Sequence, residues 1–223
     1  MAVGMSPALA AILRSWPFLW RGLLVTLAVS GLVVAASLVA GVVLGAALTY
    51  GPRLLRLPIR IIADIIRGVP ILVLIFFIYY VVPASGLKLD GFSAAVTALS
   101  LFSTAQVIEI TRGACESIHH GQLEAGRAIG LTFPQCLAWV VFPQALRRFL
   151  PPWINSVTDI VKGSALVSLV GIVDLMLSIQ QVIGRTYEPL PMYIVGALIY
   201  FAINFTLSSL SRTIEARTSI REV

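Results

Sequence analysis

The sequence predicts an all-α integral membrane protein with five transmembrane helices, and composition, run length and charge distribution lead to this fold class. The chain is 58% hydrophobic and only 12% charged, and its mean hydropathy is +0.95. A single soluble core could not bury so much apolar surface, whereas a lipid bilayer accepts it. We therefore treat residues 1–223 as one transmembrane domain.

Four runs without Asp, Glu, Lys, Arg or His are the first candidates for spans. A helix needs about 20 apolar residues to cross the hydrocarbon core of a bilayer. Residues 22–52, 68–87 and 189–211 reach this length, and residues 91–108 nearly do. The first run is too long for the apolar region of a cleavable signal peptide, which has about 7–15 residues. It also contains Gly41 and Gly45, a GxxxG pair that predicts close packing against another helix.

A further apolar region, residues 149–184, contains Asp159, Lys162 and Asp174. We interpret it as a fourth span that breaks near Gly163 and continues into a short helix. Non-helical backbone at membrane depth persists only where protein buries it or where it lines a wet cavity. The break therefore suggests a pathway, and the region brings the predicted number of spans to five.

The basic residues predict the orientation, because short cytoplasmic loops collect Lys and Arg. Eleven of the sixteen lie in residues 53–67, 112–148 and 212–221, and five lie in the remaining segments. This distribution predicts an outside N-terminus and a cytoplasmic C-terminus. The net charge of +6 then needs no nucleic-acid partner, because the basic residues flank membrane segments and meet lipid headgroups.

The sequence shows no recognisable metal or nucleotide site. Cys115 and Cys136 lack CxxC spacing and fall on the predicted cytoplasmic side, where thiols stay reduced. His119 and His120 are adjacent, so their side chains diverge on a helix, and no third ligand is in register. A phosphate-binding G-x-x-x-x-G-K-[ST] loop is absent from the sequence, so any use of ATP requires a partner.

The stretch "EAGRAIGLTFPQCLAWVVFP", residues 124–143, combines charge, small residues and two prolines. Small residues leave a helix surface with little bulk before Gly130, which predicts a helix end. Thr132 and Gln135 predict the capping box of a second helix, with Pro134 tolerated in its first turn. An apolar stripe follows at helical spacing: Cys136, Leu137, Val140 and Val141. Periodicity alone fits an amphipathic helix lying on lipid equally well.

The spacing of this stretch resembles the EAA motif of binding-protein-dependent ABC transporter permeases, EAA-x3-G-x9-I-x-L-P. Four of the seven motif positions are identical, while Gly126 replaces the second alanine, and Val140 and Phe142 replace Ile and Leu. The resemblance implies a cytoplasmic coupling helix between spans three and four that docks on an ATP-hydrolysing subunit. The residues implied in coupling are Glu124, Ala125, Gly126, Gly130, Val140, Phe142 and Pro143.

Other stretches resemble the polar amino-acid uptake permeases within that family, and the resemblance covers about residues 20–212. They are "IRGVPILVLIFFIYY" from Ile66, "TALSLFSTAQVIEITRGA" from Thr97, "KGSALVSLVGIVDL" from Lys162 and "RTYEPLPMY" from Arg185. Val69 and Leu74 depart from the family pattern by replacing a Thr and a Gln, so any polar contact those side chains make in relatives is missing here.

The resemblance implies an importer subunit rather than an enzyme, in the bacterial cytoplasmic (inner) membrane. The implied complex holds two permease subunits, either two copies or a sister chain, two ATPase subunits that bind ATP and Mg, and an extracytoplasmic binding protein that delivers an amino acid. The alternative class is a secondary transporter or channel subunit, which predicts transport without ATP. The substrate stays open among basic and neutral polar amino acids and opine-like derivatives.

Polar and ionisable residues in the predicted spans are candidates for the translocation path. A lone charge at bilayer depth costs at least about 2.5–3.5 kcal/mol, so such residues usually face protein or water. Asp159 and Lys162 can neutralise each other at i, i+3 or line the path. Glu109 can form a helix-end ion pair with Arg112 or contact substrate. The path candidates are Asn155, Asp159, Lys162, Ser164, Ser168 and Glu109.

Overall fold

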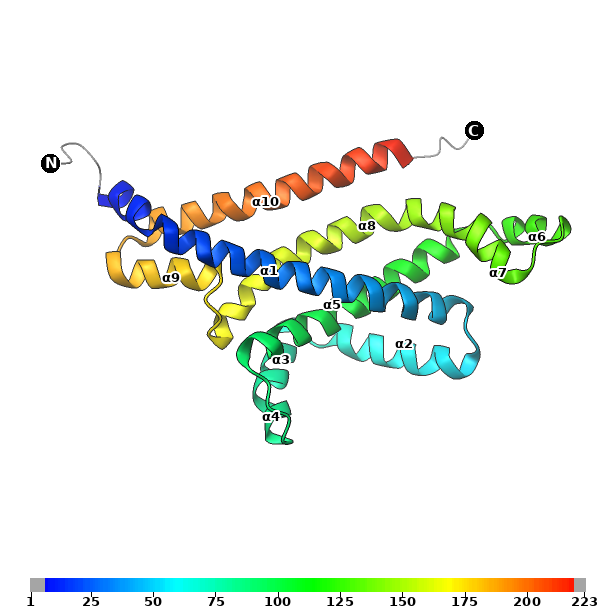
Figure 1. Cartoon of the computed structure of the whole chain (residues 1–223), viewed down its shortest axis with the longest axis horizontal. Coiled ribbons are helices and arrows are strands. Elements are labelled where there is room, and N and C mark those ends of the chain that lie inside the picture. The colour runs from blue at the N-terminus through cyan, green and yellow to red at the C-terminus, as the bar shows by residue number, and fades with distance from the viewer. Residues whose placement is uncertain (1–6, 219–223) are drawn as a thin grey trace. The chain divides into compact units, whose positions relative to one another are not determined.

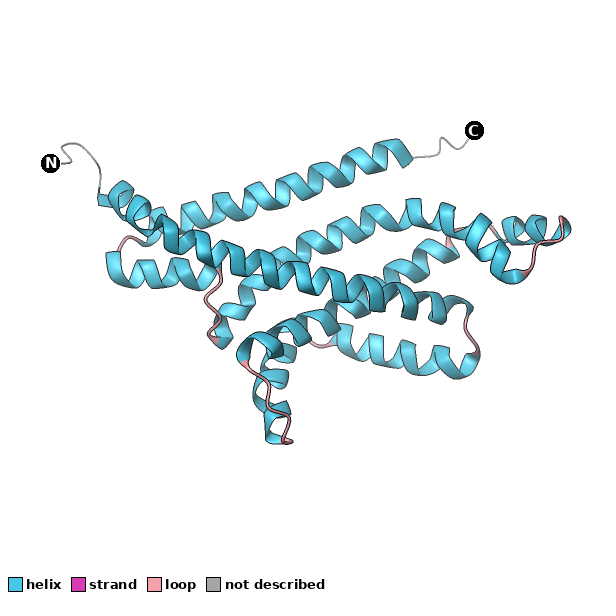
Figure 2. Cartoon of the chain, in the orientation of Figure 1, coloured by secondary structure: helices cyan, strands magenta, loops and turns pink. Residues whose placement is uncertain are grey.

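The structure is a computed structural model that describes residues 7–218 of the chain. Every regular element between these two residues is helical, and short loops join the helices (Figures 1 and 2). The all-α prediction is therefore confirmed for this range. Arg221, one of the basic residues used to predict the orientation, lies outside the described residues.

The helices follow one another with few residues between them. In chain order they are α1 (Pro7–Tyr50), α2 (Arg53–Gly68), α3 (Ile71–Phe76), a π-helical segment (Phe77–Val81), α4 (Val82–Ala84), α5 (Gly91–Glu116), α6 (His120–Ala128), α7 (Phe133–Cys136), a second π-helical segment (Leu137–Val141), α8 (Phe142–Gly163), a 3-10 helix (Ser164–Val170), α9 (Leu175–Thr186) and α10 (Pro189–Thr218).

Three helices in the described part of the chain are long and apolar enough to cross a membrane. They are Leu9–Tyr50 in α1, Gly91–Glu116 and Pro189–Glu215 in α10. Two bent pairs, Arg53–Gly68 with Ile71–Ala84 and Phe133–Val170 with Leu175–Thr186, qualify only when each pair counts as one span. The described residues thus hold three to five candidate spans, and the number five stays a prediction.

Helix α1 begins well before the uncharged run that predicted it. It has 44 residues, which corresponds to about 66 Å at about 1.5 Å per residue and is roughly twice the thickness of a bilayer's hydrocarbon core. Arg14 and Arg21 lie in its first part, and both are exposed. Long basic side chains can extend along apolar surface towards headgroups, so a membrane-embedded helix can contain them. The first uncharged residue after Arg21 therefore did not coincide with the beginning of α1.

The arginine-rich segment expected to be a loop forms helix α2. Ile59, Ala63 and Ile66 recur at helical spacing and pack in one cluster with Leu48 and Ile108. This buried stripe stabilises a helix that contains four arginines. The search for uncharged runs could not find it, because amphipathic helices alternate apolar and charged residues.

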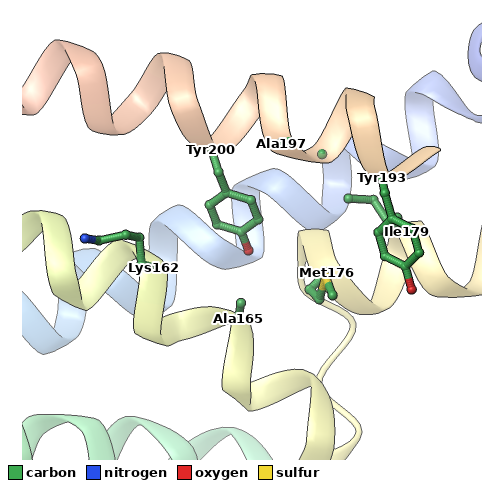
Figure 3. Close-up of a pocket in the computed structure, with 8 residues that line it drawn as sticks. Lys162, Ala165, Met176, Ile179, Tyr193, Ala197 and Tyr200 are labelled. Carbon is green, nitrogen blue, oxygen red and sulfur yellow. The ribbon is translucent and has the colours of Figure 1, made fainter. Parts of the chain in front are cut away.

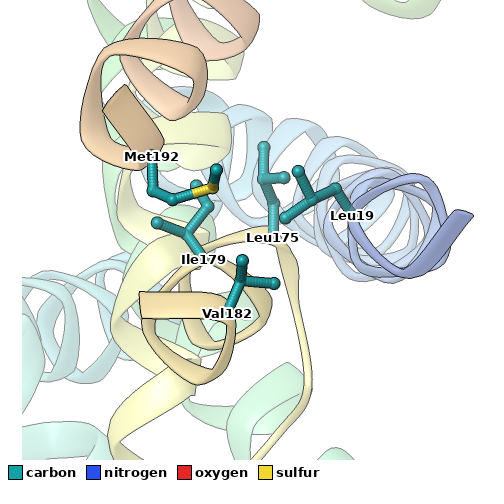
Figure 4. Packing of buried hydrophobic residues seen from close by; sticks show 5 residues of the cluster. All are labelled: Leu19, Leu175, Ile179, Val182 and Met192. Atoms are coloured by element: carbon teal, nitrogen blue, oxygen red, sulfur yellow. The ribbon is translucent and has the colours of Figure 1, made fainter. Parts of the chain in front are cut away.

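The chain forms two compact units. Within the described residues, the first comprises residues 7–33, 71–99 and 159–206, and the second comprises residues 34–70, 100–158 and 207–218. Figure 4 shows one cluster of buried side chains in the first unit: Leu19, Leu175, Ile179, Val182 and Met192. Beside this cluster the hydroxyl of Thr26 accepts a hydrogen bond of 3.1 Å from the N–H of Leu175, which satisfies a polar group at the start of α9.

In the second unit, the GxxxG pair of α1 packs directly against α5. A Cβ atom on Gly41 would lie 2.5 Å from the Cβ of Val107, and one on Gly45 would lie 2.5 Å from the Cβ of Thr111. Both distances are well below van der Waals contact, about 3.5–4.0 Å between carbon atoms. The two glycines therefore permit the close helix approach that the sequence predicted.

The predicted break after the charged part of α8 is present. Helix α8 ends at Gly163, a 3-10 helix follows, and Asp174 begins α9 by accepting a hydrogen bond of 2.9 Å from the N–H of Leu177. The glycine that turns the chain is not Gly163, whose φ is −66°, but Gly171, whose φ of 82° lies in the left-handed region. Only glycine adopts that region without a steric cost.

Candidate functional site

Helix α6 in the second unit carries the first half of the motif and has a defined beginning and end. The ring Nδ1 of His119 accepts a hydrogen bond of 3.1 Å from the N–H of Gly121 and caps the first turn. At the other end Gly130 has a φ of 87°. The N–H of Leu131 donates to the carbonyl of Gly126 at 3.1 Å, and the N–H of Gly130 donates to that of Arg127 at 2.9 Å. These bonds make a Schellman motif, so the predicted helix end is confirmed.

The second helix of the motif, α7, begins at Phe133, three residues after Gly130. The side-chain oxygen of Gln135 accepts hydrogen bonds from the backbone N–H of Thr132 at 2.8 Å and from its hydroxyl at 2.9 Å. The predicted cap at Thr132 is therefore present. Helix α7 then continues through a π-helical segment into α8, and the predicted apolar stripe faces inward, with Cys136 and Val141 buried.

Gly126, the position that departs from the EAA motif, lies where the two helices meet. A Cβ atom there would be 2.9 Å from the Sγ of Cys136, which is fully buried. Protein heavy atoms do not approach so closely without displacement. Glycine at this position thus permits the close packing of α6 on Cys136. No pattern in the sequence predicts that Gly126 and Cys136 are in contact.

The motif residues divide into an exposed set and a packed set. Gly126 is buried and Val140 is half-buried, whereas the other five implied coupling residues are exposed: Glu124, Ala125, Gly130, Phe142 and Pro143. Ile129, between the small residues and the turn, is 78% exposed. A single exposed apolar side chain does not by itself mark an interface, so Ile129 only adds an accessible apolar group to the exposed small residues.

The segment rests on a small apolar core of the second unit. Ile118, Val141 and Ala145 form this core, and Leu123 of α6 packs against it. The guanidinium of Arg148 donates a hydrogen bond of 2.6 Å to the carbonyl of Ser117. These contacts connect α6 and the turn before it to the first turns of α8.

Three of the path candidates recur on one face of α8. Asn155, Asp159 and Lys162 follow one another at intervals of four and three residues, and all three are exposed. Lys162 and Asp159 form an ion pair of 2.8 Å, as their spacing allowed. Their side chains are 57% and 64% exposed, so the pair is not sealed inside its unit.

The two serines of the candidate path behave differently. Ser164 and Ser168 are buried, and their hydroxyls donate to the carbonyls of Val161 at 2.8 Å and Ala165 at 2.6 Å. Each hydroxyl is thus satisfied by the backbone carbonyl three residues earlier in the chain. Neither serine joins the exposed face of α8.

Glu109 on α5 is the centre of an ion-pair group in the second unit. Its carboxylate lies 2.7 Å from the guanidinium of Arg112 and 3.9 Å from that of Arg67 on α2, and Arg112 also pairs with Glu116. The helix-end pair with Arg112 is thus present. The contact with Arg67 joins α5 to α2. No sequence pattern predicted this contact.

A cavity of ≈ 310 Å³ lies in the first unit beside Lys162 (Figure 3). Its other walls come from the 3-10 helix, α9 and α10, and Tyr200 reaches into it from α10, as Figure 3 shows. The remaining labelled lining residues are Ala165, Met176, Ile179, Tyr193 and Ala197. Small-molecule sites commonly have volumes of about 300–1,000 Å³ and a few polar groups, so the cavity has room for a small ligand.

The described residues contain no group of three or more His, Cys, Asp or Glu side chains that could hold a metal ion. His119 instead caps α6, as described above. Cys115 and Cys136 are free thiols, and the second fills the space beside Gly126.

Comparison with known families identifies the architecture. Residues 37–220 match the model of a family described as "Binding-protein-dependent transport system inner membrane component". The chain belongs to this family. It is therefore a membrane-embedded permease, and the family matches the one that its EAA-like motif resembles.

Individual relatives resemble this permease along almost the whole chain. It is 36% identical to the probable glutamine ABC transporter permease protein GlnP of Bacillus subtilis (strain 168), over 90% of this chain and 93% of that protein. It is also 36% identical to the glutamine transport system permease protein GlnP of Escherichia coli (strain K12), over 95% of this chain and 97% of that protein.

A solved structure shares the fold of the permease. The structure described as a crystal structure of an amino acid ABC transporter with histidines superposes with a TM-score of 0.87 at 31% identity. The match covers 93% of this chain and 97% of that one. The permease fold inferred from sequence motifs is confirmed by this likeness.

Proposed function

We propose that this permease is the transmembrane subunit of an ATP-driven, binding-protein-dependent importer of polar amino acids. The observation that carries the proposal is the EAA-like segment, which folds as a capped helix, a Schellman turn and a second capped helix. The relatives named for glutamine transport support an amino acid as cargo. The permease itself is not an enzyme, and ATP and Mg bind to a partner.

In this proposal α6 is the coupling helix that docks on the ATPase subunit. Its exposed small residues let another protein approach the backbone closely, while Ile129 supplies an apolar contact. The Schellman turn and the packing of Gly126 on Cys136 hold the helix in one orientation. A rigid element of this kind transmits movement of the ATPase to α8, as alternating access requires.

The exposed pair on α8 is the proposed contact for the cargo. A free amino acid carries one carboxylate and one ammonium group, and Lys162 and Asp159 offer the complementary charges 2.8 Å apart. A zwitterion can therefore exchange with the internal ion pair without leaving an uncompensated charge near the path. Asn155 adds an amide on the same face of the helix.

The remaining parts of the proposal concern the assembly. Two permease subunits, either two copies or a sister chain, work on two ATPase subunits, and an extracytoplasmic binding protein delivers the amino acid. The complex lies in the bacterial cytoplasmic membrane, with the N-terminus outside and the C-terminus inside. The distribution of basic residues supports this orientation, and an ABC transporter structure of similar fold supports the ATPase partnership.

Uptake into reconstituted vesicles tests the proposal. The permease is assembled with the proposed ATPase and binding-protein partners, and accumulation of radiolabelled glutamine is followed with ATP or with a non-hydrolysable analogue. We expect accumulation only with ATP and binding protein. Uptake that continues undiminished without ATP would assign the chain to the channels or secondary transporters instead. ATP-dependent uptake of another polar amino acid would keep the mechanism and change the cargo.

A further inference from the structure

Helix α2 carries its arginines on a single face. Successive residues of an α-helix are rotated by about 100°, so all four arginines fall in one sector of about 60°. They are Arg53, Arg56, Arg60 and Arg67. Asp64 is the acidic residue of the helix and borders the same sector. The face carries four positive charges against one negative charge.

The helix also leaves an apolar face uncovered. Ile59, Ala63 and Ile66 pack against other residues of the second unit, but a separate side of the helix remains exposed. Its residues are Leu54 (86% exposed), Ile61, Ile62 and Ile65. A helix with a basic face and a free apolar face is typical of the membrane interface, where the apolar side enters the acyl region.

Arg67 at the end of the helix has acidic partners. Its guanidinium lies 3.7 Å from the carboxylate of Asp64 and 3.9 Å from that of Glu109. The other three arginines are absent from the ion pairs formed within residues 9–215. Arg56 donates from Nε to the carbonyl of Gly51, at the turn between α1 and α2, and this bond leaves its terminal nitrogens available.

These three arginines line a common cavity of ≈ 390 Å³ within the second unit, which we call the arginine cavity. Leu48 and Leu57 form part of its wall, so charged and apolar surfaces meet there. The one carboxylate among its lining residues belongs to Glu116 and is already paired with Arg112. The arginine cavity therefore has an uncompensated positive charge.

We propose that the arginine cavity binds the headgroup phosphate of an anionic phospholipid, with the acyl chains along the exposed apolar face of α2. Guanidinium groups bind phosphate oxygens through two parallel hydrogen bonds and are the preferred side chains for this contact. A polybasic cluster on an amphipathic helix beside a span is the usual sequence pattern for such lipids. The inference rests on the location of the chain in a membrane and not on the proposed transport activity.

The exposed apolar face of α2 favours a phospholipid over a free phosphate ion as the ligand of the arginine cavity. An inorganic phosphate would use the arginines alone and would leave Leu54 and Ile61 in water or against uncharged lipid. A phospholipid satisfies both surfaces, because its phosphate and its acyl chains are joined in one molecule. The proposal therefore predicts that phosphate without acyl chains binds far more weakly.

Native mass spectrometry of the permease, purified from membranes with any subunits that stay bound to it, tests the proposal. The complex is titrated with phosphatidylglycerol or phosphatidylcholine at low ionic strength. The variant R53Q/R56Q/R60Q removes three positive charges from the arginine cavity. The matched control, R14Q/R21Q/K88Q, removes three positive charges from exposed positions elsewhere. We expect the wild type and the control to prefer phosphatidylglycerol and the cavity variant to lose roughly 100-fold in affinity for it.

A second variant controls for the structural role of Arg56, whose hydrogen bond to Gly51 holds the turn between α1 and α2. R53Q/R60Q leaves the hydrogen bond to Gly51 intact and should still weaken phosphatidylglycerol binding by more than tenfold. The proposal is overturned if the wild type binds both lipids equally, if R53Q/R60Q retains the preference, or if the control loses it to the same extent. Displacement of the lipid by inorganic phosphate at millimolar concentration would identify the site as a free-anion site and would also contradict it.

Discussion

Replacing Gly126 with alanine probes the contact that holds the two halves of the EAA-like segment together. The new methyl group would lie 2.9 Å from the Sγ of Cys136, and a comfortable separation is about 3.5 Å or more. The helices must therefore move apart by about 0.6 Å, the difference between these distances. Cys136 is fully buried, so its sulfur has little room to move.

The expected cost combines two opposing contributions. An extra methyl group in a packed core usually destabilises a protein by about 1–3 kcal/mol. Alanine favours a helix over glycine by at most about 1 kcal/mol. The net destabilisation should be about 0–2 kcal/mol, which corresponds to a decrease of up to roughly 8 °C in Tm for a chain of this size.

The double variant G126A/C136A isolates the contact. Removing the sulfur of Cys136 alone leaves a small cavity, and the methyl group at position 126 can occupy that space. We expect a coupling energy of about 1–2 kcal/mol between the two substitutions, so the double variant should be more stable than the sum of the single variants predicts. Gly113→Ala on α5 is the control, because no heavy atom lies within 4 Å of a Cβ there.

Thermal unfolding of the five purified proteins (wild type, G126A, C136A, G126A/C136A and G113A), followed by intrinsic fluorescence in one detergent, gives the required Tm values. Under the proposed function, co-purification of the ATPase subunit shows whether the EAA-like segment still docks on it. Strictly additive Tm changes, or a G126A variant as stable as Gly113→Ala, would refute the packing argument. The departure of Gly126 from the EAA motif would then have no structural reason in α6 and α7.

Three further predictions follow from individual residues. Gly130→Asp places a side chain at a φ of 87° at a cost of roughly 1–2 kcal/mol; the subunit should insert normally but lose its ATPase in a pull-down. Asp159→Asn or Lys162→Gln should each lower uptake, and the double variant should assemble normally yet keep altered uptake; full recovery would leave only an ion pair. The exposed carboxylate of Asp90 accepts a hydrogen bond from Ser93, which holds its pKa below the usual value of an aspartate. Its stabilising contribution is therefore present above the unfolded-state pKa and lost as the pH falls through the lower folded-state pKa, and Asp90→Asn should flatten this acid-side loss of Tm.

The sequence predicted those parts of the permease that depend on local chemistry. The turn at Gly130, the cap at Thr132 and the end of α8 at Gly163 all follow from residues close to one another in the chain. The GxxxG pair predicted close helix packing without naming its partner α5. Such features can be predicted because the hydrogen-bonding groups that pair in them are close together in the sequence, and local preferences agree with the final fold.

Contacts between distant residues could not be predicted from the sequence. The fit of Gly126 against Cys136 and the approach of Arg67 to Glu109 depend on how helices pack, and spacing along the chain does not encode that. Helix α2 was missed for another reason. Its four arginines interrupt the sequence, so a criterion based on uncharged runs does not detect the apolar stripe that packs against the core.

Site-specific photo-cross-linking tests the central claim, that α6 docks on the ATPase subunit rather than lying on lipid. A photo-reactive amino acid at Ile129, which is 78% exposed, is activated in membranes that contain the assembled complex. Leu87, which is 64% exposed in the loop before α5, serves as the control position. The account predicts a covalent adduct between position 129 and the ATPase and none from position 87. Adducts of position 129 with lipid alone would contradict it.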